Sequence, residues 1–224
     1  PSYMNEAAQK PRGRPAGIIG QYQELTAGSA GWQQRAERVI PGGTPRQPGH
    51  WLPYPLTISR AQGAYIFDVD GRAYIDLTNN YTSLVHGHGY EPILDAVRRQ
   101  LGQGTAWAAS NAPQLELAET LVSRIPGMDL VRFTNSGTEA ANLALMIARI
   151  VTGRYKFLMA RYGYHGPMLE FEVGSFDLEG PSTYKATYND AASFRAALQE
   201  HGAEIAAVFL EPVMGAGGVV AAEL

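Results

Sequence analysis

The stretch that decides the fold is RFTNSGTEAANLALMIAR, residues 132–149, where a short apolar run gives way to a helical pattern. The apolar run LVRFT at 130–134 ends in Asn-Ser-Gly-Thr-Glu. Ala- and Leu-rich sequence follows, with apolar residues three and four apart. We therefore predict a buried strand at 130–134 and a helix from Ser136 to about Thr152.

The residues from 77 onward repeat this alternation of strand and helix. Further helices are predicted at 91–104, 113–125 and 190–202, and further strands at 156–160 and 205–213. Strands that alternate with helices form a parallel sheet, because each helical crossover returns the chain to the edge where the previous strand began. This part of the chain is therefore predicted to be α/β.

The residues before 77 have a different pattern. An arm at 1–28, partly helical near Ile18–Leu25, precedes a short amphipathic helix at 31–43 that ends in Pro-Gly-Gly. The sequence PLTISRAQGAYIFDVDGRAYIDL then predicts a small β-meander.

The meander has three β-favouring runs, at 56–59, 64–68 and 73–77, separated by Gln-Gly and Asp-Gly. Asp-Gly is a strong hairpin signal, because both central residues of the tight turn need positive φ. The predicted division is therefore an N-terminal arm, helix and meander at 1–76, and an α/β part at 77–224.

The composition is that of an ordinary globular protein, with 224 residues and 18 basic against 21 acidic residues, for a net charge of −3. This weak charge, without a basic run, argues against a nucleic-acid surface. No apolar run approaches the roughly 20 residues that span a bilayer, and the first residues lack a signal-peptide core. The absence of cysteine excludes disulfides, thiolate nucleophiles and cysteine-bound zinc. We expect a cytoplasmic protein without nucleic-acid or membrane partners.

The segment at 135–139 has two interpretations. Ser136 with Glu139 three residues later is a capping box, which would simply start the helix. A helix N-terminus also presents free N–H groups and partial positive charge, so Ser136, Gly137 and Thr138 are equally a candidate phosphate-binding cup. Ligands of open parallel sheets lie at the carboxyl ends of strands, where this segment falls. The residues alone leave both interpretations open.

Other polar residues follow the later strands. Tyr164 could stack on an aromatic ligand, and His165 could orient or move a proton, although half-buried packing would explain both. Glu211 places a carboxylate at the end of a buried strand, either at a site or in solvent. A phosphate cup, an aromatic ring and a carboxylate together suit an aromatic phosphorylated cofactor. His86 and His88 lack a nearby third ligand, so we predict no metal site.

The motifs FTNSGTEA, RIVTGRYK, YGYHG and FLEPV together resemble class III aminotransferases of the fold-type I, pyridoxal-phosphate-dependent group. AYIFDVDGRAYIDL and HGHGYEPILDAV resemble the N-terminal stretch of that family. VIPGGTPR is similar to the start of glutamate-1-semialdehyde aminomutases, and LPYPLTISRAQGA is closer to aminotransferases of β-amino acids such as β-phenylalanine. The resemblance begins near Trp32 and implies the N-terminal half of an α/β fold that binds pyridoxal 5'-phosphate (PLP) and forms homodimers.

The resemblance also implies roles for individual residues. Six positions match cofactor-binding residues: Ser136, Gly137, Thr138, Tyr164, His165 and Glu211. The first three would bind the phosphate, the next two would stack on and flank the pyridine ring, and the last would lie near that ring. Arg46 matches an arginine that grips the substrate carboxylate, since a guanidinium fork suits a carboxylate. Trp51 and Tyr54 are predicted to wall an aromatic substrate pocket.

The catalytic residue is not among these positions. The resemblance places the aspartate that pairs with the pyridine nitrogen, and the Schiff-base lysine, beyond residue 224. None of the three lysines, Lys10, Lys156 and Lys185, matches that position. The expected activity is amino-group transfer between a β-amino acid and a keto acid. The alternatives are a glutamate-1-semialdehyde-type aminomutase and a truncated PLP- or phosphate-binding module without turnover.

Overall fold

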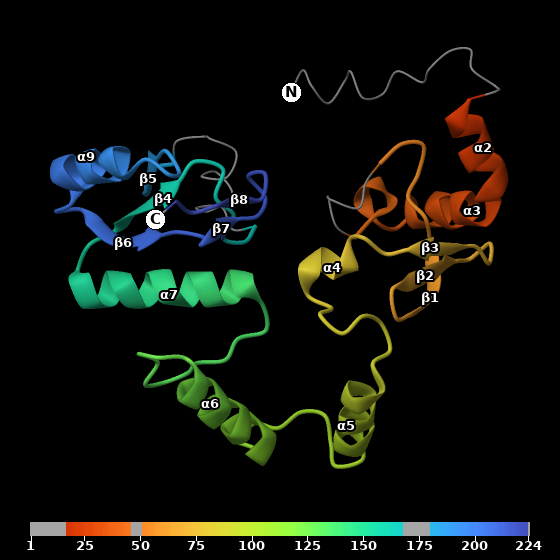
Figure 1. Cartoon of the computed structure of the whole chain (residues 1–224), viewed down its shortest axis with the longest axis horizontal. Helices are drawn as coiled ribbons and strands as arrows, with labels where there is room; N and C mark the ends of the chain where they lie inside the picture. The colour runs from red at the N-terminus through yellow and green to blue at the C-terminus, as the bar shows by residue number, and fades with distance from the viewer. Residues whose placement is uncertain (1–16, 46–50, 168–179, 224) are drawn as a thin grey trace. The chain divides into compact units, whose positions relative to one another are not determined.

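The computed structural model describes residues 17–45, 51–167 and 180–223 (Figure 1). The described residues up to Ala109 form one compact unit, and those from Ser110 onward form another. The domain boundary that the sequence predicts after residue 76 stays a prediction.

The first unit contains a helical part, a meander and a final helix. Its elements in chain order are α2 (Ile18–Leu25), α3 (Ala27–Ala36), the 3₁₀ turn η1 (Pro41–Gly43), β1 (Ile58–Gln62), β2 (Tyr65–Asp68), β3 (Ala73–Ile75), the short turn α4 (Asn79–Thr82) and α5 (Glu91–Leu101). The helix predicted in the arm is confirmed by α2, and the one predicted at 91–104 by α5, which ends earlier, at Leu101. The helix predicted at 31–43 is wrong in its bounds: α3 begins at Ala27 and ends at Ala36, and Pro41–Gly43 forms a separate 3₁₀ turn.

The three strands form the predicted antiparallel meander, in the order β1-β2-β3. The first strand lies later than the predicted 56–59, because its pairing with β2 continues as far as Gln62 opposite Tyr65. The turn between these strands is therefore Gly63 and Ala64, and β2 pairs on with β3 from Tyr65 opposite Ile75.

The second hairpin turn of the meander caps a helix. Asp70 accepts hydrogen bonds from the backbone N–H groups of Gly28, at 2.7 Å, and Ser29, at 3.2 Å, in the first turn of α3. The N-cap residue of α3, Thr26, makes no such side-chain bond. The buried Asp68 in turn accepts from the N–H of Asp70, at 3.0 Å. Carboxylates therefore connect the meander to α3 where the helix needs acceptors.

The second unit contains a parallel sheet with helices. Its elements are α6 (Ala112–Arg124), α7 (Gly137–Thr152), β4 (Lys156–Ala160), β5 (Thr183–Ala186), α9 (Ala191–His201), β6 (Ile205–Phe209), β7 (Val213–Met214) and β8 (Val220–Ala221). The sheet order is β5-β4-β6, and both pairings of β4 are parallel, as predicted.

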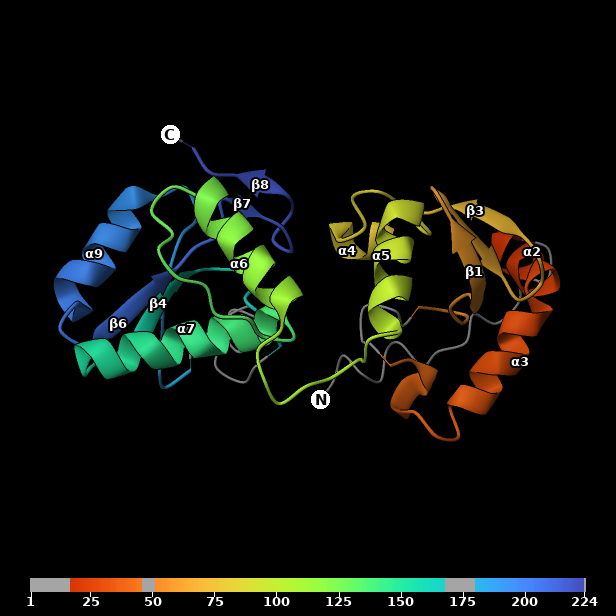
Figure 2. The same cartoon turned by 90° about the horizontal axis from the view of Figure 1, so that it is seen from below.

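The core of this unit follows from the alternation of side chains along β4. Phe157 and Met159 pack against Leu145 of α7, whereas Leu158 packs with Ile205 and residues of α9. Figure 1 shows α7 and α9 on the two faces of the sheet, and Figure 2 shows α7 running alongside β4 and β6. The sheet therefore holds the N-terminus of α7 near the carboxyl ends of its strands.

Three predictions for this unit need correction. The stretch 130–134 is not a buried strand, because none of the described residues pairs with it and Leu130 is 90% exposed. The strand predicted at 205–213 ends at Phe209, where its pairing with β4 stops. Strand β5, Thr183–Ala186, is missed by the sequence pattern, because four residues carry little periodicity and its register comes from β4.

Candidate functional site

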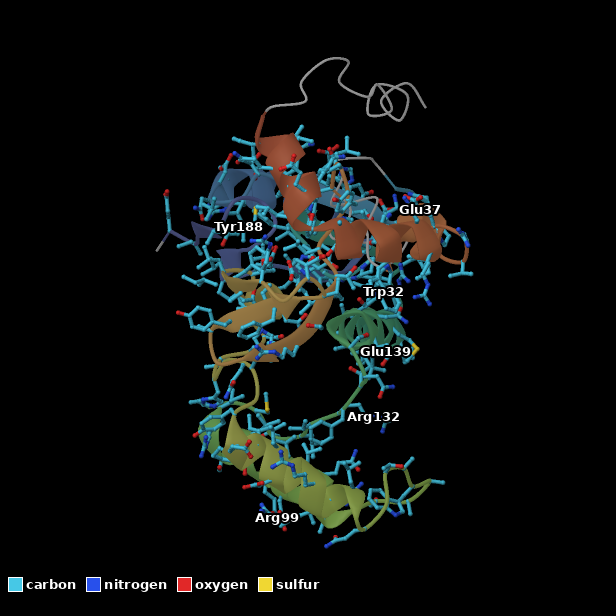
Figure 3. All side chains as sticks on the ribbon, turned by 90° about the vertical axis from the view of Figure 1, so that its right-hand side faces the viewer. Trp32, Glu37, Arg99, Arg132, Glu139 and Tyr188 are labelled. Atoms are coloured by element: carbon cyan, nitrogen blue, oxygen red, sulfur yellow. The ribbon has the colours of Figure 1, made fainter. Side chains whose placement is uncertain are left out.

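The start of α7 is a capped helix N-terminus. Ser136 lies in extended backbone and its Oγ accepts the N–H of Glu139 at 3.2 Å. The carboxylate of Glu139 accepts the N–H of Asn135 at 2.6 Å, rather than that of Ser136 as in the standard capping box. Figure 3 labels Glu139 on this helix. The capping interpretation of the segment is therefore confirmed in its main bond.

The cap leaves the first N–H groups of the helix open. Among the described residues, none accepts a hydrogen bond from the backbone N–H groups of Gly137 and Thr138. A Cβ placed on Gly137 would have no neighbouring atom within 4 Å. An anion can therefore approach these two donors, and the partial positive charge of a helix N-terminus favours one there. Capping and anion binding are compatible, because they use different groups of the same turn.

The loop that follows β4, residues 161–167, packs directly on this turn, and we call it the aromatic loop. Gly166 has φ +105°, and a Cβ built on it would lie 2.5 Å from Oγ1 of Thr138. Only glycine allows this approach at this backbone conformation. The aromatic loop and the phosphate cup of Ser136, Gly137 and Thr138 are therefore neighbours within the same unit.

The two aromatic-loop side chains differ in their surroundings. Tyr164 is 51% exposed, so part of the residue is accessible to a ligand. His165 is partly buried, with its ring 5.5 Å from that of Phe209. Burial lowers the pKa of His165 below its usual value, and the Glu211 carboxylate acts in the opposite direction. The histidine is therefore suited to a neutral, orienting role.

Glu211 joins the aromatic loop to a second loop. Its Oε2 accepts the backbone N–H of Tyr164 at 2.9 Å, and its Oε1 accepts the N–H of Gly215 at 3.1 Å. Gly215 begins the glycine loop, residues 215–218. The hydroxyl of Tyr188 donates to the backbone carbonyl of Glu211 at 2.8 Å, a contact that the sequence gives no sign of.

The predicted substrate residues belong to the first unit. Arg46 lies outside the described residues. Trp51 is 48% exposed. Tyr54 is buried, with its ring 5.3 Å from that of Tyr22 and its hydroxyl 3.2 Å from Oγ1 of Thr26. Their roles at a substrate pocket stay predictions.

The two lysines in the described part of the chain lie on the sheet. Lys156 opens β4, at the end of the strand opposite to the aromatic loop. Its Nζ lies 3.0 Å from Oε2 of Glu204 and 2.9 Å from the hydroxyl of Tyr184. Hydrogen bonds to Tyr184 and Glu204 raise the pKa of Lys156, so it stays a cation. Lys185 lies within β5.

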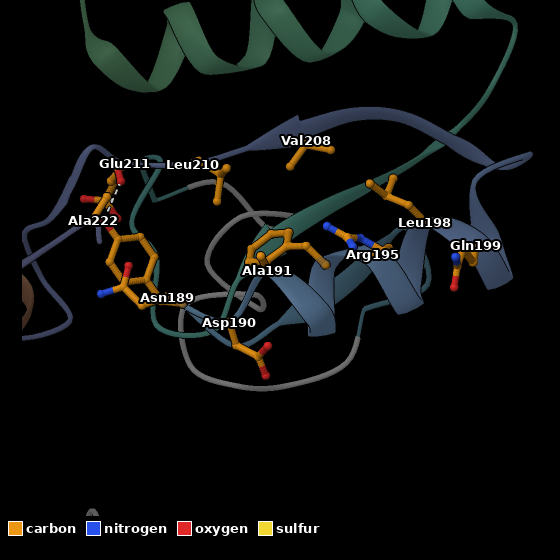
Figure 4. A pocket seen from close by; sticks show the side chains of 12 residues that line it. Asn189, Asp190, Ala191, Arg195, Leu198, Gln199, Val208, Leu210, Glu211 and Ala222 are labelled. Atoms are coloured by element: carbon orange, nitrogen blue, oxygen red, sulfur yellow. Dashed lines mark hydrogen bonds between the residues drawn. The ribbon is translucent and has the colours of Figure 1, made fainter. Parts of the chain in front are cut away.

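A hollow of about 600 Å³ lies between α9 and β6 (Figure 4). Val208 and Leu210 contribute apolar surface to it, and Glu211 borders it.

In the described residues no group of three or more His, Asp or Glu side chains could hold a metal ion. His88 instead contacts Asp76, with 2.8 Å between Nε2 and Oδ2. None of the described helices is long and apolar enough to cross a membrane.

Comparison with known families gives a match to aminotransferase class III over residues 48–224. The beta-phenylalanine transaminase of Variovorax paradoxus is 37% identical over 203 residues, covering 89% of this chain and 47% of the relative. The glutamate-1-semialdehyde 2,1-aminomutase of Dichelobacter nodosus is 36% identical over 199 residues, covering 81% of this chain and 47% of the relative. The chain thus spans about half the length of these curated relatives.

Solved structures give the same picture of the fold. The crystal structure of a beta-phenylalanine aminotransferase from Variovorax paradoxus aligns with a TM-score of 0.86 at 35% identity, covering 92% of this chain and 48% of the other. A transaminase with PLP bound aligns with a TM-score of 0.85 at 31% identity, covering 89% and 50%. The predicted α/β fold of PLP-dependent transaminases is therefore confirmed for this chain.

Proposed function

The chain belongs to the class III aminotransferase family, and on that premise we propose that it is part of a PLP-dependent aminotransferase. The proposed reaction moves an amino group between a β-amino acid and a keto acid. The observation that carries the proposal is the open turn at Gly137 and Thr138, in direct contact with the loop that presents Tyr164. The similarity to a beta-phenylalanine transaminase supports the substrate class.

The residues of this site fit a phosphorylated aromatic cofactor. Gly137 and Thr138 offer two unused backbone donors and a hydroxyl to the phosphate, with the helix dipole behind them. Tyr164 offers an exposed ring for stacking, and His165 lies beside it. Bound PLP supplies the electron sink that makes amino-group transfer possible. The protein's part is to hold the phosphate and fix the plane of the ring.

The substrate side of the proposal rests on the first unit. Arg46 would bind the substrate carboxylate through its two-pronged guanidinium. Trp51 would contribute an exposed aromatic face, and Tyr54 would support that segment from its buried position. We also propose a homodimer and a cytoplasmic location; a sequence without cysteine is compatible with a reducing compartment.

One alternative has nearly equal support. The aminomutase of Dichelobacter nodosus is almost as similar to this chain as the transaminase is. Such an enzyme exchanges amino groups within one molecule, so it needs no separate keto-acid acceptor. A phosphate- or PLP-binding module without turnover is the third candidate. A binding experiment on the 224-residue chain tests what all three share, namely the phosphate cup.

The test is Thr138→Val, with PLP and inorganic phosphate as separate ligands. Removing one hydroxyl that bonds to a charged group costs about 1.5–3 kcal/mol. Affinity for both ligands should therefore fall roughly 10- to 150-fold. Thr152→Val is the matched control, because its Oγ1 bonds to the carbonyl of Ala148, at 2.7 Å, at the far end of the same helix. Unchanged affinity in Thr138→Val would mean that the turn is only a helix cap.

A further inference from the structure

The Glu211 carboxylate lies between two loops that are far apart in sequence. Strand β6 ends at Phe209, and Glu211 follows two residues later. One carboxylate oxygen accepts the N–H of Tyr164, 47 residues away, and the other accepts the N–H of Gly215. Both oxygens of the side chain are therefore engaged with backbone groups of the protein itself.

The backbone of Glu211 is held from another side. The Tyr188 hydroxyl donates to its carbonyl oxygen at 2.8 Å, from the turn that precedes α9. The backbone of Glu211 is therefore held in place, and the two hydrogen bonds of its carboxylate have defined directions. Bonds between a carboxylate and N–H donors are stronger than bonds between neutral groups, so they suit a fastening role.

The aromatic loop, which Glu211 holds, also contacts the phosphate cup. Tyr164 is held at its N–H by Glu211, and two residues later Gly166 packs against Thr138. Immediately before Tyr164, a Cβ on Gly163 would lie 3.3 Å from Nε2 of His165 and 3.6 Å from Oε2 of Glu211. The aromatic loop is therefore packed closely between Glu211 and the first turn of α7.

We propose that Glu211 is a positioning residue that latches the aromatic loop to the glycine loop and thereby fixes the Tyr164 ring for the cofactor. This proposal rests on the proposed PLP-binding function, and in it Glu211 itself touches neither cofactor nor substrate. The Tyr164 ring can stack on a pyridine only when its backbone is held. The phosphate cup is built on α7 and does not need the latch.

Glu211 could act through its two hydrogen bonds or only through its negative charge, and the chemistry of the side chain distinguishes these roles. Two N–H donors need two acceptors, which a carboxylate supplies and a carboxamide does not, because its NH₂ is itself a donor. Glu211→Gln should therefore lose at least one bond despite its equal size. If Glu211 acted only through its negative charge, Glu211→Gln would remove that charge and would strengthen the binding of every phosphate-bearing ligand.

The first measurement compares affinities for PLP and for inorganic phosphate on the 224-residue chain. Glu211→Gln and Glu211→Ala should weaken PLP binding roughly 10-fold or more, as expected for a lost bond to a charged group. Phosphate affinity should stay within about a factor of two, which is well under the tenfold change that 1.4 kcal/mol produces. Glu204→Gln is the matched control, because Glu204 lies just before β6 and pairs with Lys156 instead. Equal affinity for PLP in wild type and Glu211→Gln, or equal losses for both ligands, would overturn the positioning role.

The second measurement needs no ligand. Hydrogen exchange of the Tyr164 and Gly215 amides, followed by NMR, reports the two latch bonds directly. Glu211→Ala should accelerate both amides, Glu211→Gln at least one, and Glu204→Gln neither. Protection of both amides in Glu211→Ala would refute the latch even if PLP binds. If wild type fails to bind PLP while the exchange results hold, the proposed function fails and the latch between the loops stands, without its cofactor role.

Discussion

Leu145→Ala should be the most damaging single truncation in the helix that carries the phosphate cup. Leu145 is 1% exposed and packs against Phe157 and Met159 of β4, both fully buried. Its removal loses the transfer free energy of the side chain and leaves a cavity. The two neighbours are held in the sheet ladder and cannot close the gap easily. The expected loss of stability is therefore about 3–4 kcal/mol, within the usual range for buried leucines.

The next residue of the same helix provides the control. Met146 is 49% exposed, so Met146→Ala removes a side chain of similar size that is half in solvent. Its cost should be below about 1 kcal/mol, because exposed substitutions rarely destabilise much. Comparing the two variants removes the contribution of helix propensity, since alanine is introduced in the same turn each time.

Urea unfolding measures the difference. Trp32, Trp51 and Trp107 all precede Ser110, so tryptophan fluorescence follows the first unit only. Far-ultraviolet circular dichroism follows the helices of both units. Leu145→Ala should lower the midpoint of the second unit by more than about 1 M urea, and the tryptophan transition should stay in place. If Leu145→Ala and Met146→Ala cost the same, the packing of α7 through Leu145 is refuted.

Two further predictions concern the first unit. Asp70→Ala should destabilise it by about 0.5–2 kcal/mol, because α3 loses its only side-chain cap among the described residues. Asp70→Asn should cost less. Equal melting temperatures of wild type and both variants would contradict the capping role. The hydrogen bond to His88, followed by backbone N–H bonds, lowers the pKa of Asp76. Its ionised form therefore stabilises the fold above the ordinary carboxyl pKa of about 4, and this stabilisation is lost as pH falls through the lowered value. Asp76→Asn should accordingly melt earlier than wild type at pH 7, with a difference that shrinks in acid. A pH-independent difference would exclude a stabilising role for the ionised Asp76 carboxylate.

Helix positions are predictable from the sequence because their signals are local. The N-cap of α7 is Ser136, and its partner Glu139 lies three residues away. The N-cap of α9 is Asp190, whose carboxylate accepts the N–H groups of Ala192 and Ser193 at 3.0 and 3.1 Å. Each cap is complete within four residues, so no distant part of the chain has to be known.

Strand positions are less predictable because a strand needs a partner. The apolar run at 130–134 reads as a buried strand, yet within the described residues nothing pairs with it. Strand β5 is the opposite case. Its sequence pattern is weak, but it pairs along its full length with β4, from Phe157 opposite Thr183 to Ala160 opposite Ala186. Neighbouring strands supply what local sequence does not specify.

The same distinction between local signals and contacts with distant segments applies to the candidate site. The residue types and their places after strands predict a phosphate cup, an aromatic ring and a carboxylate, since parallel strands end at one edge. The sequence does not predict how they touch, because Gly166 against Thr138 and Glu211 with Tyr164 are contacts between distant segments. The cup depends on one helix turn, whereas the placement of the ring depends on those two contacts. Thr138→Val should therefore weaken PLP and phosphate alike, and Glu211→Gln should weaken PLP alone, so the ratio of the two affinities separates the local part of the site from the part that the fold assembles.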